Sequence, residues 1–310
     1  MPSTDIPPAL LLTWAALFGL IVGSFLNAAI YRLPREGLSI GNPKRSLCPG
    51  CGRQVRAREN IPVVSWLLLR GKCAGCGWRI PWRYPFVELL TGVLFVVAAR
   101  LAPPGEWGLI VVWWIVIAGL VVATFVDFDF FEIPDEVSIG GMFAGPIASL
   151  VVPQLHAGTW LAVRLSEGGE VDRFGALIGS LAGLAVGGGV LYAIGVLGSK
   201  AFGRDAMGFG DVKLLAAGGA FVGPGGALAA LLIGAFVASF FGLANMVRFT
   251  CLSRSRARAR GGEKALGRSI AVGRIAARYL PFGPYLGIGI GIVLLDWNHV
   301  VEVLRGLLRA

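Results

Sequence analysis

The stretch LIVVWWIVIAGLVVATFV occupies residues 109–126, and the acidic stretch DFDFFEIPDE follows it at residues 127–136. A helix of eighteen uncharged residues is about 27 Å long, close to the roughly 30 Å hydrocarbon core of a bilayer. The sequence therefore predicts a membrane-spanning helix that ends in a group of carboxylates. Further apolar runs lie at residues 9–30, 85–101, 137–152, 174–198, 212–222, 226–247 and 279–295. Together they predict an all-α polytopic membrane protein with about eight transmembrane helices.

The composition supports this membrane assignment. Of the 310 residues, 55% are hydrophobic and 15% are charged, and the mean hydropathy is +0.73. The net charge of +10 comes from basic residues that gather between the apolar runs. That distribution favours contact with anionic membrane lipid and argues against nucleic acid as a partner.

The charges also predict the topology. Residues 31–83 hold eleven Lys or Arg against two Glu, and residues 248–278 hold nine against one. By the positive-inside rule both segments are cytoplasmic, and residues 153–173 then lie on the other side. Residues 1–13 contain no Lys or Arg. The first apolar run therefore lacks the basic start of a cleavable signal peptide and is expected to remain as a span.

Four of the five cysteines form two Cys-x-x-Cys pairs, Cys48 with Cys51 and Cys73 with Cys76. Two such pairs on turns that contain Gly or Pro are typical of a structural zinc site with four thiolate ligands. In a cytoplasmic loop metal binding is favoured over disulfides. We therefore expect one structural Zn²⁺, and an iron site with the same ligands remains an alternative.

These features divide the chain into three expected parts. Residues 1–30 form the first transmembrane helix, residues 31–83 form a small cytoplasmic zinc-binding loop domain, and residues 84–310 form a membrane-embedded core. Within that core Gly175, Gly179, Gly183 and Gly187 recur at every fourth position. They predict one helical face at which another helix packs closely.

Two aspartates stand out as candidates for chemistry. Asp127 is the most deeply placed carboxylate of the acidic stretch, and ionisable groups at such depth are costly and usually functional. Asp211 lies in the stretch GFGDVK at residues 208–213, directly before an apolar run, where the glycines permit close backbone approaches. Taken alone, Asp211 fits a helix N-cap equally well. The predicted topology, however, puts both aspartates at the same membrane face.

Two carboxylates brought together in a site of low dielectric share one proton, so that one serves as base and the other as acid. This is the chemistry of aspartic proteases, in which the pair activates water. We therefore predict that Asp127 and Asp211 are catalytic. Asp129 is the alternative to Asp127, although it lies farther from the span and can simply face solvent.

At this point the sequence resembles the type IV prepilin peptidases, which are grouped with the Gly-x-Gly-Asp membrane aspartyl proteases. The likeness runs through nearly the whole chain and includes both cysteine pairs and both aspartates. Its other motifs are GSFLN at residues 23–27, YRLP at 31–34, RYPFVE at 83–88, GFGDVKLLA at 208–216 and PFGPY at 281–285.

The resemblance implies a membrane aspartic endopeptidase of the bacterial inner membrane with its active site at the cytoplasmic face. Its substrates would be type IV prepilins or type II secretion pseudopilins. The family also methylates the new N-terminal residue with S-adenosylmethionine. Gly71 and Lys72 match a pair that the family uses for methylation, and Glu88 matches a family glutamate. We therefore expect Lys72 to serve methylation more than cleavage.

Other functions remain as alternatives. The chain could be a peptidase without methyltransferase activity, or a non-catalytic membrane scaffold or transporter. Its carboxylates gather at one membrane face, whereas an ion path would favour carboxylates spread through the bilayer. The chain departs from the family pattern in a long segment at residues 151–173, which we expect to be an outer loop and a contact for a partner.

Overall fold

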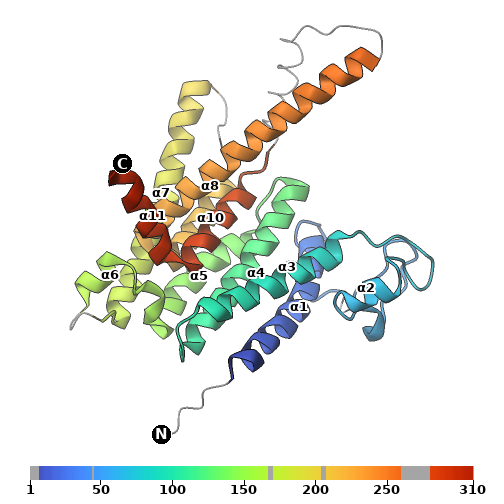
Figure 1. Ribbon diagram of the computed structural model, residues 1–310, viewed down its shortest axis with the longest axis horizontal. Helices are drawn as coiled ribbons and strands as arrows, with labels where there is room; N and C mark the ends of the chain where they lie inside the picture. Colours follow the sequence, from blue (N-terminus) through green and yellow to red (C-terminus); the bar gives the residue numbers. More distant parts are fainter. Residues whose placement is uncertain (1–6, 44, 167–169, 204–206, 260–279, 310) are drawn as a thin grey trace.

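The structure is a computed structural model that describes residues 7–43, 45–166, 170–203, 207–259 and 280–309. Within these ranges it is helical, with isolated β-bridges but no strand. The long helices are α1 (Pro8–Arg32), α3 (Arg83–Leu101), α4 (Trp107–Phe130), α5 (Asp135–Val151), α7 (Arg173–Phe202) and α8 (Phe209–Ala259). The shorter elements are η1 (Ala57–Glu59), α2 (Val64–Leu68), η2 (Pro153–His156), α6 (Trp160–Leu165), α10 (Gly283–Leu295) and α11 (Trp297–Arg309). The all-α fold predicted from the apolar runs is thus confirmed for these residues (Figure 1).

The predicted count of eight spans is not confirmed. Five described helices are long and apolar enough to cross a membrane, or six if the α10–α11 pair, which is bent by 103°, forms one span. Three of the eight expected runs account for this difference. Helix α5 has only 17 residues. Residues 212–222 and 226–247 form the two parts of α8 on either side of the non-helical Gly223, and they count as one of the five long helices.

Helix α8 is sharply bent at Gly223, whose φ of 74° and ψ of 175° are not helical. Only glycine adopts this conformation readily, and Pro224 follows it. A Cβ atom on Gly219 would lie 3.2 Å from Cβ of Ala227, a contact that a straight helix cannot make between residues eight apart. The chain therefore turns back at Gly223, and the parts before and after it run in opposite directions.

The predicted glycine face on α7 is confirmed as a packing surface. A Cβ atom on Gly183 would lie 2.0 Å from the Gly219 carbonyl oxygen, and one on Gly187 would lie 2.5 Å from the Leu215 carbonyl oxygen. Helices α7 and α8 thus touch through their backbones, which no larger residue would permit.

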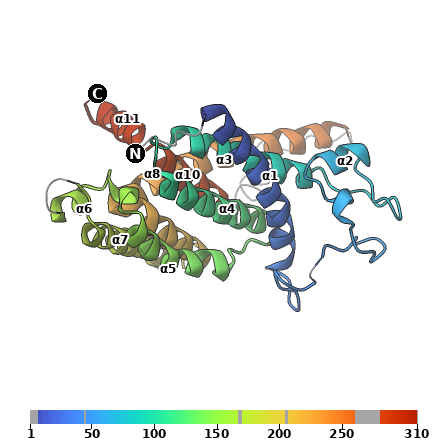
Figure 2. The same ribbon diagram turned by 90° about the horizontal axis from the view of Figure 1, so that it is seen from below.

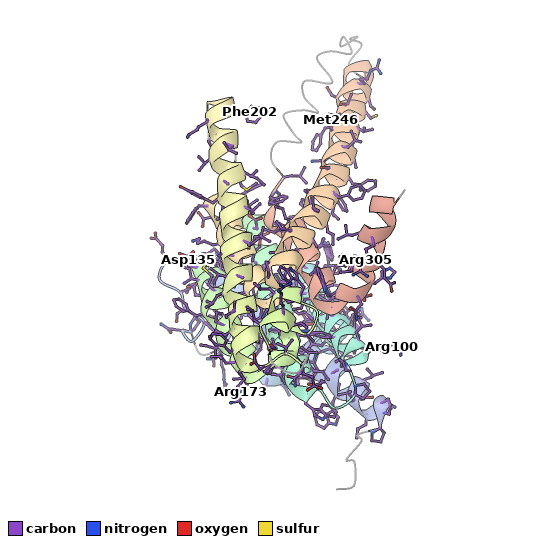
Figure 3. All side chains as sticks on the ribbon, turned by 90° about the vertical axis from the view of Figure 1, so that its left-hand side faces the viewer. Arg100, Asp135, Arg173, Phe202, Met246 and Arg305 are labelled. Atoms are coloured by element: carbon purple, nitrogen blue, oxygen red, sulfur yellow. The ribbon has the colours of Figure 1, made fainter. Side chains whose placement is uncertain are left out.

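The helices form two groups that meet at α4. Helices α1 and α3 pack on one side of α4, while α5, α7, α8 and α10 lie on its other side. Figures 1 and 2 show the loop that carries α2 at one extreme of the molecule and α6 at the opposite extreme. Helices α7 and α8 extend past the other helices, so that Phe202 and Met246 lie toward one end and Arg173 and Arg100 toward the other (Figure 3).

The described residues of the 151–173 segment, 151–166 and 170–173, contain more helix than the outer loop that we expected. They contain η2 and α6, and Ala162 is fully buried against α7. Thr159 contacts the bend at Gly223, and the Trp297 indole donates a hydrogen bond to the Gly158 carbonyl at 3.0 Å. This segment therefore packs against the bend of α8 and the start of α11. Part of the predicted basic segment 248–278 lies outside the described residues.

Candidate active site and metal centre

Asp127 lies in the last turn of α4. The helix ends because Phe131 adopts a left-handed conformation with a φ of 57°, and its N–H still bonds to the Asp127 carbonyl at 3.0 Å. The Asp127 side chain is only 5% exposed. Its Oδ2 atom accepts a hydrogen bond of 2.9 Å from the backbone N–H of Gly283, at the start of α10. Two helices far apart in sequence thus fix the position of this carboxylate.

Asp211 lies in the first turn of α8 and shares a cavity with Asp127. We call this space the carboxylate cavity; its volume is about 500 Å³, and its walls include Leu33, Pro34, Ile133 and Phe209. Both aspartates line the wall of this cavity. The structure therefore brings together the two aspartates that the sequence singled out.

The other carboxylates of the acidic stretch occupy different positions. Asp129 lies outside the carboxylate cavity and forms a salt bridge with Arg83. Asp135 forms one with Lys213 and so ties the start of α5 to α8. Glu132 and Glu136 line the carboxylate cavity. Among the described residues of its wall Lys213 is the only basic one, so this part of the wall carries net negative charge.

Gly283 is a site residue whose role the sequence did not reveal, although its motif PFGPY formed part of the family resemblance. A Cβ atom at this position would lie 2.6 Å from Asp127 Oδ2 and 3.0 Å from Cδ1 of Ile133. The carboxylate therefore rests directly on the glycine backbone. The sequence signal was the glycine between Phe282 and Pro284, but nothing local linked it to an aspartate 156 residues away.

The four paired cysteines cluster as predicted. The Sγ atoms of Cys48, Cys51, Cys73 and Cys76 all lie within 4.8 Å of one another. Such a group could hold a metal ion. The Sγ atoms of Cys48 and Cys76 are 3.8 Å apart. Thiolates at about 2.3 Å from a tetrahedral Zn²⁺ are separated by about 3.8 Å. The donor set and spacing therefore fit a structural metal.

The two cysteine turns have the same construction. The residue after each pair, Gly52 or Gly77, has a positive φ and donates its N–H to the carbonyl of the first cysteine of its pair, Cys48 or Cys73. The backbone N–H groups of Gly75 and Cys76 also lower the pKa of the Cys73 thiol to about 6. Such N–H groups stabilise thiolate, the form that binds metal.

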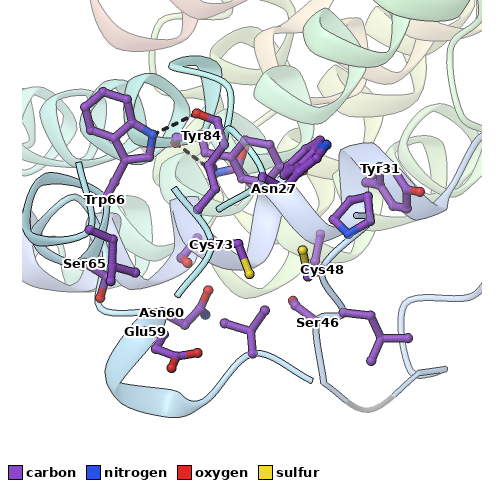
Figure 4. A pocket seen from close by; sticks show the side chains of 18 of the residues that line it. Asn27, Tyr31, Ser46, Cys48, Glu59, Asn60, Ser65, Trp66, Cys73 and Tyr84 are labelled. Atoms are coloured by element: carbon purple, nitrogen blue, oxygen red, sulfur yellow. Dashed lines mark hydrogen bonds between the residues drawn. The ribbon is translucent and has the colours of Figure 1, made fainter. Parts of the chain in front are cut away.

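A second cavity adjoins the cysteine cluster (Figure 4). We call it the loop cavity; it has a volume of about 410 Å³ and lies between the end of α1, the cysteine loop and the start of α3. Its wall includes Asn27, Cys48, Trp66, Cys73, Tyr84 and Glu88. The three residues matched to methylation are thus separated: Glu88 lines the cavity, Gly71 lies behind Trp66, and Lys72 is exposed and outside the lining.

Known proteins that resemble this chain match it over most of its length. A prepilin leader peptidase/N-methyltransferase of Aeromonas salmonicida (strain A449) is 32% identical, and the match covers 95% of this chain and 93% of that relative. This chain belongs to the type IV leader peptidase family. A relative of the same name from Neisseria gonorrhoeae is 36% identical over 74% of this chain and 79% of its own length.

The type IV leader peptidase family is also recognised in its two separate parts. The model of the bacterial peptidase A24 N-terminal domain matches residues 17–101, which contain the cysteine cluster and the loop cavity. The model of the type IV leader peptidase family matches residues 114–243, which contain Asp127 and Asp211. Gly283 lies beyond this match. No solved structure matches the chain significantly.

Proposed function

We propose that this protein removes the leader peptide from type IV prepilins or type II secretion pseudopilins and then N-methylates the new N-terminal residue with S-adenosylmethionine. The observation that supports cleavage is the buried Asp127, held by the Gly283 N–H, in one cavity with Asp211. We place the protein in the bacterial inner membrane, with this cavity at the cytoplasmic face and its basic segments against membrane lipid.

The proposed cleavage needs one proton shared by two carboxylates. The ionised aspartate accepts a proton from water as the water oxygen attacks the scissile carbonyl carbon. The protonated aspartate donates to the carbonyl oxygen. As the tetrahedral intermediate collapses and the C–N bond breaks, the aspartate that took the water proton gives it to the leaving amine, and the other aspartate takes its proton back from the intermediate's hydroxyl. The contact between Gly283 and Asp127 Oδ2 holds one carboxylate in a single orientation for both steps.

The direct test uses the purified full chain, a prepilin and S-adenosylmethionine labelled on its methyl group. Loss of the leader and incorporation of label are followed separately. Leader loss with label on the new N-terminus supports the complete proposal, and leader loss without label leaves a peptidase alone. Absence of leader loss contradicts the proposal.

We further propose that the cysteine cluster binds one Zn²⁺ that orders the loop of residues 31–83. Structural zinc sites contribute on the order of 10 kcal/mol or more to folding. The double variant Cys48→Ser, Cys73→Ser should therefore fall from about one metal ion per chain to nearly none. Residues 46–80 should also become sensitive to protease. Elemental analysis of the wild-type protein distinguishes zinc from iron.

Cys251→Ser is the matched control for the metal prediction, because Cys251 is exposed on α8 and belongs to no cysteine pair. This variant should keep its metal and its protease resistance. Full metal occupancy in the double variant would show that other residues bind the ion.

The negative charge of the carboxylate cavity suits the basic leader of a prepilin. We therefore expect Glu132→Lys, Glu136→Lys to raise the KM for a prepilin about tenfold or more while kcat changes little. Charges at a binding rim act mainly on association, and salt screens them. The effect of the substitutions should accordingly shrink as the ionic strength rises.

The matched control is Glu106→Lys, Glu170→Lys, which changes the net charge equally away from the carboxylate cavity. Its KM should stay near the wild-type value. An unchanged KM in the Glu132, Glu136 variant at low salt would remove these glutamates from leader recognition.

A further inference from the structure

Helix α10 leads away from the carboxylate cavity, toward the opposite membrane face. It starts beside Asp127, near the end of α4. One turn farther on, a Cβ atom on Gly287 would lie 3.3 Å from Thr124 Oγ1. After another turn, a Cβ atom on Gly291 would lie 4.0 Å from Cδ1 of Leu120. Successive turns of α10 thus meet earlier turns of α4, so the two helices are antiparallel and α10 ends on the side from which α4 starts.

The chain changes direction at the end of α10. Asp296 has a φ of −146° and a ψ of 58°, which are not helical, and its Oδ1 atom accepts a hydrogen bond of 3.3 Å from the His299 N–H. Asp296 therefore caps α11 as a separate helix. Helices α10 and α11 are bent by 103° relative to each other. Because α10 follows α4, which is long and apolar enough to span the membrane, α11 runs nearly at a right angle to a span (Figure 1).

The sequence of α11 is amphipathic. At about 100° per residue, its polar and glycine positions form one face and its apolar positions the other. The polar and glycine positions are 298, 299, 302, 305, 306 and 309, and the apolar positions are 297, 300, 301, 303, 304, 307 and 308. Val300 is 8% exposed, and Leu304 packs against the same core cluster, whereas Glu302 and Arg305 are exposed. Helix α11 therefore lays its apolar face on the protein and turns its polar face outward.

The start of α11 is fixed to the segment of residues 153–173, which the charge topology predicts on the side opposite the carboxylate cavity. The Trp297 indole donates to the Gly158 carbonyl at 3.0 Å, and a Cβ atom on Gly225, just after the bend of α8, would lie 3.4 Å from the Trp297 ring. Trp160, two residues after Gly158, is 66% exposed. Tryptophan is enriched at the boundary between membrane and water. The start of α11 therefore belongs at this boundary.

The helices beneath α11 are short. Helix α10 has 13 residues and is about 20 Å long, and α5 has 17 residues and is about 26 Å long. Both are shorter than the hydrocarbon core of about 30 Å. Exposed apolar residues on α10, Ile288 and Ile292, are followed by Val303 on α11, which is 49% exposed. The apolar surface of the short helix α10 therefore continues onto α11.

From this arrangement we infer that α11 is an interfacial helix that lies in the plane of the phospholipid bilayer, on the face opposite the carboxylate cavity. Val303 at one edge of its apolar face contacts acyl chains, and Arg305 at the other edge contacts headgroup phosphates. Glu302 lies on the face turned to water. An amphipathic helix of this kind is buried about 5–10 Å into the boundary between headgroups and acyl chains. The inference goes beyond cleavage and methyl transfer and depends on neither.

The depth of α11 is measured on the purified full chain in vesicles of phosphatidylethanolamine and phosphatidylglycerol. A nitroxide is attached to p-acetylphenylalanine at one position at a time, so that no cysteine is modified. Oxygen concentrates in hydrocarbon and a nickel chelate in water, and the ratio of their collisions with the nitroxide reports its depth. A label at position 303 should collide mostly with oxygen, whereas labels at positions 299 and 302 should collide mostly with the chelate.

Labels at positions 288 and 57 are the matched references, because Ile288 is exposed on the span side of α10 and Ala57 is exposed in the cysteine loop. They report hydrocarbon and water, respectively. A label at position 303 that the chelate reaches as readily as position 57 would place α11 in water and overturn the inference. Labels at positions 302 and 303 that both match position 288 would make α11 a continuation of α10 through hydrocarbon, which also overturns it.

A substitution gives a second test. In vesicles, Val303→Asp should make the backbone amides of residues 300–308 exchange with deuterated water at least about tenfold faster, because a carboxylate at this edge opposes burial in lipid. Glu302→Gln is the control on the polar face, and its exchange should stay near the wild-type rate. None of the described residues of α11 lines either cavity, so leader cleavage and metal content should be unchanged in both variants. Equal exchange in Val303→Asp and the wild type would show that lipid does not hold α11 and would overturn the inference.

Discussion

Asp127→Asn and Asp211→Asn are each expected to reduce leader cleavage by at least about 1,000-fold. Asparagine keeps the size of aspartate but can neither accept the proton of water nor share one with its partner, and positioned acid–base groups contribute about 100- to 10,000-fold each. Because the wild-type pair must carry a single proton, its cleavage rate should be bell-shaped in pH. Either variant should lose activity over the whole pH range. The measurement is leader loss from a purified prepilin.

Asp129→Asn is the internal control for this prediction. Asp129 pairs with Arg83 and does not line the carboxylate cavity, and exposed salt bridges contribute at most about 1 kcal/mol. This variant should retain cleavage near the wild-type rate. Substantial cleavage by Asp211→Asn at any pH would contradict the aspartyl mechanism. An inactive Asp129→Asn beside an active Asp127→Asn would assign the role to Asp129.

Gly283→Ala is expected to lower kcat for cleavage about 100-fold or more. The added Cβ atom would lie 2.6 Å from Asp127 Oδ2, so the carboxylate would have to move away from the N–H that orients it. A displacement of about 1 Å at a catalytic group can cost about 100-fold. Since the cysteine cluster and the loop cavity are lined by other elements, metal content should not change.

Gly291→Ala provides a matched control on the same helix. A Cβ atom there would meet nothing closer than 4.0 Å, so α10 should tolerate it. Cleavage should remain near the wild-type rate. If Gly283→Ala also cleaved normally, the hydrogen bond to Asp127 would be dispensable for the reaction.

The sequence predicted those features that depend on local chemistry. The spacing of Cys48, Cys51, Cys73 and Cys76 was sufficient to expect one cluster, because metal ligands at such turns converge in few ways. The carboxylates at the ends of two apolar runs, combined with charge topology, were sufficient to bring Asp127 and Asp211 to one cavity. The first argument uses the spacing of the ligands themselves, and the second adds the charges of the loops between the apolar runs.

Features set by long-range packing were not predictable in this way. The count of eight spans is not confirmed, because apolar runs report composition and not whether each helix is long enough to cross a membrane, as the 17 residues of α5 show. The contact between Gly283 and Asp127 joins segments that no local pattern connects. The loop cavity forms where α1, α3 and the cysteine loop meet. The residues of its wall could therefore not be predicted from motifs.

The bend at Gly223 connects Asp211 to the segment that precedes α7. Between these two residues runs a single helical rod about 18 Å long, and helices of this length resist compression along their axis. Thr159 contacts Gly223 at one end of this helical segment, and Asp211 lies at the other end. The segment before α7 therefore contacts the end of this helical stretch that lies opposite to Asp211. A bulkier side chain at position 159 would press on this bend, and any shift of residues 211–223 would also disturb their close backbone contacts with Gly183 and Gly187 of α7.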